Sequence, residues 1–92
     1  MNLPEKKFRW SQEKNIVLLQ TRGMTFGKLI GFRVIDTVKN KTANHAHQSL
    51  VLFDCEGYVW AAPYVDDGGY YFLKTAYPSR KFTRFYREKG EI

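Results

Sequence analysis

Positive charge gathers between residues 74 and 89. Six Lys or Arg residues stand there against one acid, Glu88, so the stretch carries about five of the net charge of +6 on the 92-residue chain. At roughly 100° per residue, Arg80, Arg84 and Arg87 fall on one face of a helix. Because a guanidinium makes planar two-point hydrogen bonds to phosphate, this stripe predicts a phosphate-binding surface. A solvated helix face with no partner is the competing interpretation.

The balance of 15 Lys and Arg residues against nine Asp and Glu residues is compatible with several partners. By itself it favours nucleic acid, an anionic membrane or an acidic protein about equally. Tyrosines interleaved with the cations could stack unpaired bases, although packing in the core explains most of them more simply. These tyrosines are Tyr70, Tyr71, Tyr77 and Tyr86.

Two histidines, His45 and His47, stand in the polar stretch from Lys39 to Gln48. Histidine is the one side chain whose unperturbed pKa allows proton exchange near neutrality. His47 is the better candidate for proton transfer because it adjoins the strand expected to begin at Ser49. A surface histidine without a chemical role, or a metal-binding His-x-His pair, remains the alternative.

Metal and covalent chemistry find little support in the sequence. Two histidines and the lone Cys55 cannot complete a structural zinc site without borrowed carboxylates, and one cysteine forms no internal disulfide. The acidic stretch 66–69 fits a hairpin turn better than a cation loop. Cys55 has no evident base beside it, which favours packing over nucleophilic catalysis. We therefore expect no metal.

Two helices are expected near the start of the sequence. Ser11 can cap a helix that begins at Gln12 and ends at Arg22-Gly23, and Thr25 can cap a second helix that continues to about Phe32. Apolar residues of the first helix would supply its packing surface: Ile16, Val17, Leu18 and Leu19. In the second helix, Phe26, Leu29 and Ile30 would face the core.

Residues 8–10, before the two helices, alternate like a short strand. Four further strands are expected after the helices, and the β-branched run 34–38 is the first of them. Glu56-Gly57 predicts a tight hairpin between strands 49–55 and 58–62, and residues 66–69 a second turn before a strand over 70–75. Pro78 would end that strand. The four strands from residue 34 onward would form an antiparallel meander.

A last helix is expected after Ser79, with Arg80, Arg84 and Arg87 on one face. Its opposite half would carry Phe82, Phe85, Tyr86 and the stem of Lys89. The sequence thus predicts a single α+β domain over residues 1–92, with two N-terminal helices, a four-stranded antiparallel sheet and a C-terminal basic helix. The helices would lie on one face of the sheet. With no long apolar run or secretory signal, a cytoplasmic protein without membrane contact is expected.

Two groups of residues give the sequence a family resemblance. Phe8-Arg9-Trp10, Glu13-Lys14-Asn15, Arg22-Gly23 and Thr25-Phe26 resemble the opening of BrnT-type toxins. The run from Phe72 to Lys81 is similar to the final strand and basic helix of small chromosomal toxins related to that group. The similarity spans Phe8 to Tyr86 and lies in the order and spacing of short motifs. It implies the RelE-like fold of metal-independent ribonucleases in type II toxin-antitoxin systems.

The resemblance also implies a reaction, a partner and a set of roles. An RNA 2′-hydroxyl would attack the adjacent phosphate without any cofactor. The toxin would form a hetero-oligomer with its antitoxin, which in this group is often a ribbon-helix-helix DNA-binding protein. The implied catalytic groups are His47 for proton transfer, and Lys74 and Arg80 for phosphate charge. The implied RNA-binding residues are Lys81, Arg84, Tyr86 and Arg87. A non-catalytic basic module that binds RNA or an acidic protein is the alternative.

Overall fold

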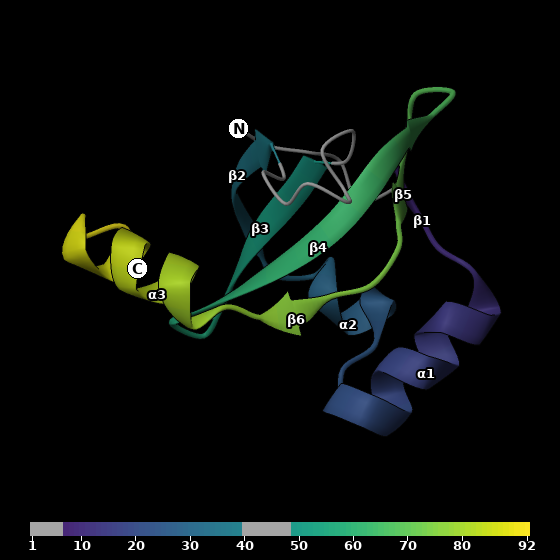
Figure 1. The fold of residues 1–92 in the computed structure, drawn as a ribbon, viewed down its shortest axis with the longest axis horizontal. Helices are drawn as coiled ribbons and strands as arrows, with labels where there is room; N and C mark the ends of the chain where they lie inside the picture. Colours follow the sequence, from purple (N-terminus) through teal and green to yellow (C-terminus); the bar gives the residue numbers. More distant parts are fainter. Residues whose placement is uncertain (1–6, 40–48) are drawn as a thin grey trace.

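The computed structural model describes residues 7–39 and 49–92 and has an α+β architecture (Figure 1). These residues form three helices and six strands. In chain order they are β1 (Phe8–Arg9), α1 (Gln12–Arg22), α2 (Phe26–Leu29), β2 (Arg33–Lys39), β3 (Ser49–Cys55), β4 (Tyr58–Asp67), β5 (Tyr70–Leu73), β6 (Tyr77–Pro78) and α3 (Arg80–Glu88).

Helix α1 begins and ends where its capping residues predict. The Ser11 hydroxyl accepts a hydrogen bond from the Lys14 amide, and Gly23 ends the helix in the left-handed conformation with φ +66°. Its apolar residues are less buried than expected, because within the helix only Leu18 is fully packed. The exposed ones are Ile16, Val17 and Leu19.

Helix α2 is a single turn and is shorter than predicted. Thr25 caps it as expected, and the buried side chains of Phe26 and Leu29 anchor it to the core. The chain then tightens, since the Gly31 amide bonds to the Lys28 carbonyl three residues back. The chain enters β2 at Arg33.

The central hairpin between β3 and β4 forms at Glu56-Gly57 as predicted. Both turn residues have positive φ, +56° at Glu56 and +89° at Gly57, which suits the twist of a two-residue hairpin. Strands β2, β3, β4 and β5 are antiparallel neighbours in that order. A register shift between Val34 and Asp36 interrupts the regular pairing of β2 with β3.

Two short strands make the sheet mixed and six-stranded, where four antiparallel strands were expected. Strand β1 pairs in parallel with β5, and β6 pairs with β4. Strand β5 ends at Leu73 and covers only the last part of the ten-residue β4. The edge of β4 near Trp60 is therefore free for β6, and Pro78 is accommodated there at a sheet edge.

Helices cover both faces of the sheet, which corrects the expectation that they share one face. Figure 1 shows α1 and α2 together on one side of the sheet and α3 at the opposite end. The first core cluster joins α1 and α2 to Val51 and Phe53, whereas the second joins α3 to Leu50 and Leu52. Successive residues of β3 therefore point into different clusters, and the strand is almost continuously apolar for this reason.

Candidate phosphate-binding site

Helix α3 is fixed to the sheet by its first two turns. The Ser79 hydroxyl caps the helix by accepting from the Phe82 amide at 3.1 Å. The Ser79 amide donates to the Val59 carbonyl, and the Val59 amide donates to the Thr83 hydroxyl, both at 2.8 Å. The helix thus continues the edge of β4 beyond β6, and this attachment sets the direction of its exposed side chains.

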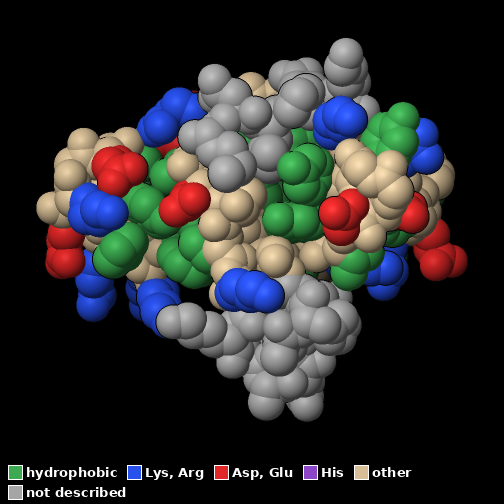
Figure 2. All heavy atoms as spheres, turned by 90° about the horizontal axis from the view of Figure 1, so that it is seen from above, with side chains coloured by type: hydrophobic (Ala, Val, Ile, Leu, Met, Phe, Trp, Pro, Cys, Tyr) green, Lys and Arg blue, Asp and Glu red, His purple; other side chains and the backbone are tan. Residues whose placement is uncertain are grey.

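The exposed side of α3 forms one wall of a groove of about 480 Å³. Arg80, Arg84 and Arg87 all line it, so the predicted shared face of these residues is confirmed. The remaining lining residues are Tyr58, Thr83 and Glu88. In the space-filling view, Lys and Arg side chains lie beside Asp and Glu side chains at the end of the molecule that carries α3, and further Lys and Arg side chains lie at the opposite end (Figure 2).

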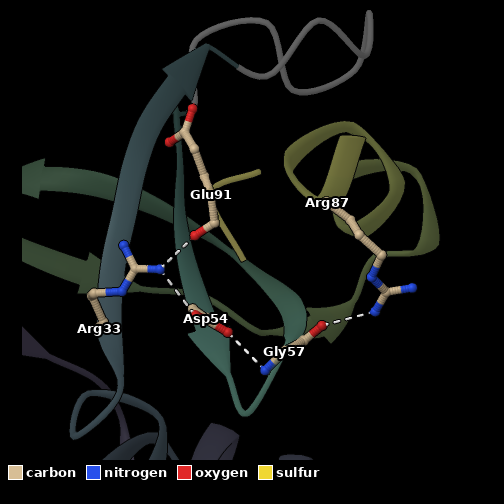
Figure 3. A network of polar contacts seen from close by, with 5 residues as sticks. All are labelled: Arg33, Asp54, Gly57, Arg87 and Glu91. Atoms are coloured by element: carbon tan, nitrogen blue, oxygen red, sulfur yellow. Dashed lines mark hydrogen bonds and ion pairs between the residues drawn. The ribbon is translucent and has the colours of Figure 1, made fainter. Parts of the chain in front are cut away.

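The three guanidiniums are not equivalent. Arg87 donates to the Gly57 carbonyl at 3.0 Å, which ties it to the central hairpin (Figure 3). Within residues 7–39 and 49–92, the guanidiniums of Arg80 and Arg84 make no hydrogen bond or ion pair. Neither of the two ion pairs found there includes a groove arginine. Their donors are available to a ligand, and planar donors in this number suit a phosphate.

A polar network supports the hairpin to which Arg87 is tied. Asp54 accepts from the Gly57 amide at 2.8 Å and from the Arg33 guanidinium at 3.0 Å. Arg33 also donates to the Glu91 carbonyl, so β2, the hairpin and the segment after α3 meet at this point (Figure 3). The position of Arg87 thus depends on contacts made on the far side of the hairpin.

Three groove residues were missed by the sequence analysis. Thr83 is the buried residue whose hydroxyl accepts from the Val59 amide and holds α3 to β4. Glu88 brings a carboxylate, a possible proton acceptor, beside the arginines, and its spacing of four from Arg84 was a usable signal. Tyr58 brings a phenol from the start of β4. Only the docking of α3 against that strand places Tyr58 in the groove, and no local pattern indicates it.

Lys74 lies in a different place from the arginines. It lines a second groove of about 310 Å³ together with Phe72, Val65, Asp66 and Asp67. The Lys74 amide bonds to the Pro63 carbonyl, whereas Pro78, just before α3, pairs with Trp60. Three residues of β4 separate these points, or about 10 Å at the rise of a strand. The structure therefore does not bring Lys74 into one groove with Arg80.

Lys81 is exposed and is not among the residues that line the arginine groove.

Tyr86 is part of the core, which corrects its expected place on the RNA surface. Its side chain is 4% exposed and packs in the second cluster. Its hydroxyl donates to Asp36 Oδ2 at 3.4 Å. Burial, followed by the nearby Asp36 carboxylate, raises the pKa of Tyr86. Phe85, expected to face the core, is instead 50% exposed.

The histidines, Cys55 and a metal site are the other candidates that the sequence analysis considered. His47, like His45, lies outside the described residues. Cys55 is a buried free thiol, and burial raises its pKa to about 12, which leaves it protonated at neutral pH. Among residues 7–39 and 49–92, no group of three or more His, Cys, Asp or Glu side chains is placed to hold a metal ion.

The chain was compared with protein families, curated proteins and solved structures. No protein-family model, curated protein or solved structure matches the chain. In the described segments, no helix has the length and apolar character needed to cross a bilayer.

Proposed function

We propose that this chain is the toxin of a type II toxin-antitoxin system and a metal-independent endoribonuclease of the RelE-like superfamily. The observation that carries the proposal is the gathering of Arg80, Arg84 and Arg87 in one groove. Two of these guanidiniums have no protein partner among the described residues. Cationic donors that can reach the oxygens of one phosphate are what phosphoryl chemistry in RNA requires.

In the proposed reaction, an RNA 2′-hydroxyl attacks the adjacent phosphorus and the 5′-oxygen leaves. Negative charge grows on the phosphate oxygens, and the guanidiniums of Arg80 and Arg84 would stabilise it by donating hydrogen bonds to them. Arg87, held by the Gly57 carbonyl, would position the RNA. The products are a 2′,3′-cyclic phosphate and a free 5′-hydroxyl, so the reaction needs no cofactor.

The proposed reaction needs one group that accepts the proton of the 2′-hydroxyl and a second group that donates a proton to the leaving 5′-oxygen. His47 is proposed from its chemistry, and Glu88 from its place in the groove. The pH dependence of cleavage distinguishes them. A limb of the pH–rate profile that disappears in His47→Ala assigns the proton transfer to the histidine, whereas a limb that disappears in Glu88→Gln assigns it to the carboxylate.

The proposal keeps Lys74 in a changed role. Because Lys74 lies about 10 Å along the sheet from the start of α3, it would bind a neighbouring phosphate of the RNA instead of the reacting one. Lys81 would add only long-range attraction.

The test is toxicity together with cleavage. Expression without a partner should stop growth, and the purified chain should cut RNA into fragments with cyclic phosphate ends. Arg80→Ala should lower the cleavage rate by roughly 100-fold or more, as loss of a transition-state donor does. Lys28→Ala, an exposed cation on α2, is the matched control. A double variant Arg80→Ala/His47→Ala that stays toxic and cuts RNA would overturn the assigned site.

The proposed partner is an antitoxin, expected to be a ribbon-helix-helix DNA-binding protein. Ile16, Val17 and Leu19 leave apolar surface exposed on α1, which a partner protein would cover. The neighbouring reading frame should encode this partner, and its co-expression should restore growth. Failure of every adjacent product to do so contradicts the toxin-antitoxin assignment.

A second candidate is a basic module that binds RNA or an acidic protein and does no chemistry. This function needs only phosphate binding, for which the guanidiniums of Arg80 and Arg84 suffice, whereas cleavage also needs a general base beside the phosphate. In that case RNA would bind with a steep salt dependence and remain uncut.

A further inference from the structure

A second cationic surface lies on β1, β5 and the residue that follows β5, apart from the arginine groove. It consists of Arg9, Tyr70, Phe72 and Lys74, which we call the edge surface. The Arg9 guanidinium lies 3.6 Å from the centroid of the Tyr70 ring, and the Lys74 ammonium 4.9 Å from that of Phe72. Each aromatic ring is thus paired with a cation.

The edge surface faces the same side of the sheet as α3. Phe8 and Tyr71 pack in the cluster beneath α1 and α2, so their strand neighbours Arg9 and Phe72 point to the opposite face. Val65 of β4, the cross-strand partner of Phe72, shares this face with Ala61, which packs under α3. RNA leaving the arginine groove across this face would therefore reach the edge surface.

Neither core cluster accounts for the two rings of this surface. Of the four tyrosines considered for base stacking, Tyr71 packs in the first cluster, and Tyr77 and Tyr86 pack in the second. Tyr70 and Phe72 belong to neither cluster and are half-buried, while Arg9 is exposed. Arg9 and Phe72 are also Cα partners in the parallel pairing of β1 with β5, so the two residues lie on the same face of the sheet.

We infer that the edge surface binds unpaired RNA bases by stacking, with the Arg9 guanidinium, supported by Tyr70, and the Phe72 ring as platforms. Unpaired bases stack on both aromatic rings and guanidinium planes. Lys74 contributes a cation for the adjoining phosphate. Asp66 and Asp67 line the groove beyond Phe72 and repel phosphate there, so bases and not the backbone lie toward the β4–β5 turn. The inference deepens the proposed function and rests on RNA being its ligand.

Base stacking and phosphate binding differ in how the affinity for RNA depends on salt concentration. Removing a phosphate contact reduces the slope of log affinity against log salt by about 0.7 for single-stranded nucleic acid, whereas removing a stacked base leaves that slope unchanged. Arg9→Lys keeps the charge and removes the planar platform. Phe72→Leu keeps an apolar side chain and removes the ring. Each should weaken binding roughly 5- to 100-fold at every salt concentration.

The experiment uses the full chain with an unpaired 2′-O-methyl oligonucleotide, which cannot be cut by 2′-hydroxyl attack and so separates binding from catalysis. Fluorescence anisotropy across a salt series would compare wild type, Arg9→Lys, Phe72→Leu and Arg84→Ala. Lys28→Ala, on the other face, should bind like wild type. Phe72→Trp should retain wild-type affinity, which separates loss of stacking from loss of fold. A 5-iodouracil in the oligonucleotide should crosslink to Phe72 or Tyr70.

Three results would overturn the inference. If Arg9→Lys and Phe72→Leu bind like wild type while Arg84→Ala binds weakly, the groove holds RNA and the edge surface does not. If the chain binds a Glu-rich peptide and no crosslink reaches β5, the surface serves an acidic protein. If no variant differs and wild type does not bind, the proposed function falls as well. Cleavage that fails while stacking is observed would instead count against the proposed reaction alone.

Discussion

The amide of Val59 on β4 and the hydroxyl of Thr83 on α3 are joined by a buried hydrogen bond of 2.8 Å. The same hydroxyl donates to the Ser79 carbonyl at 2.6 Å, so both of its hydrogen-bonding directions are used. Thr83 is 3% exposed and lies beneath the groove arginines. One buried hydroxyl therefore connects the end of the sheet to the helix that carries the proposed site.

Thr83→Val should lower the free energy of unfolding by about 1–3 kcal/mol. Valine has nearly the same shape but leaves the Val59 amide without its acceptor in a buried place. Urea denaturation measures the change. Thr83→Ser keeps the hydroxyl and should lose clearly less, so equal losses in the two variants would contradict a role for this bond.

Glu56→Asn should raise the free energy of unfolding by about 0.5–1 kcal/mol. Glu56 has φ +56°, a left-handed conformation that asparagine adopts at lower cost than glutamate, and it precedes Gly57 in the turn. Thermal melting would measure the gain. Gly57→Ala, at φ +89°, should be destabilising, and a stable Gly57→Ala variant would contradict this account of the turn.

Asp54→Ala should destabilise the protein more than Arg33→Ala. The exposed Arg33–Asp54 ion pair contributes about 0–1 kcal/mol, but Asp54 also accepts from the Gly57 amide and so supports the hairpin. We expect a loss of roughly 1–3 kcal/mol for Asp54→Ala, measured by urea denaturation. The double variant should resemble Asp54→Ala, and a further large loss would mean that Arg33 acts mainly through Glu91.

Stability should fall as the pH rises above about 9. The Cys55 thiol has a pKa of about 12 in the folded chain and an ordinary value of 9.0, so the folded state holds its proton more tightly. The contribution is complete below the unfolded pKa and is lost as the pH rises toward the folded one. Burial raises the pKa values of Tyr77 and Tyr86 as well, which acts in the same direction at higher pH.

Urea denaturation at a series of values from about pH 8 to about pH 11 checks this alkaline loss. Cys55→Ala should be less stable at the lower end, because it leaves a small cavity, but should lose less stability as the pH rises. Wild type and variant that decline in parallel would show that the thiol does not contribute.

The groove arginines should differ in what their removal does. Arg84→Ala removes a guanidinium that has no partner among residues 7–39 and 49–92, and it should weaken RNA binding without lowering stability by more than about 0.5 kcal/mol. Arg87→Ala also removes the bond to the Gly57 carbonyl and should affect both quantities. Anisotropy and thermal melting on the same preparations compare them. Unchanged binding in both variants would contradict phosphate binding in the groove.

Features decided by a few neighbouring residues could be predicted from the sequence. Ser11, Thr25 and Ser79 cap helices as expected, and the hairpin turn forms at Glu56-Gly57. The shared face of the three arginines follows from helical geometry alone. Each of these features depends on residues close together in the chain.

Features that depend on packing between distant elements could not be predicted in this way. Phe85 was expected inside because it is apolar, but the strip of α3 that meets the sheet is centred on Thr83 and Tyr86. A threonine there is buried for its hydrogen bond to β4, which apolarity does not indicate. The separation of Lys74 from Arg80 likewise arises because β6 returns to β4 between them.

The parallel pairing of β1 with β5 matches Phe8 to Tyr71 and Arg9 to Phe72. A ribosome completes the first partner of each pair long before the second, and contacts of such large sequence separation form slowly. During synthesis β1 cannot pair until β5 has emerged, after β2, β3 and β4, and α3 emerges after β5. The arginine groove consequently takes shape only after β1 and the central strands have emerged.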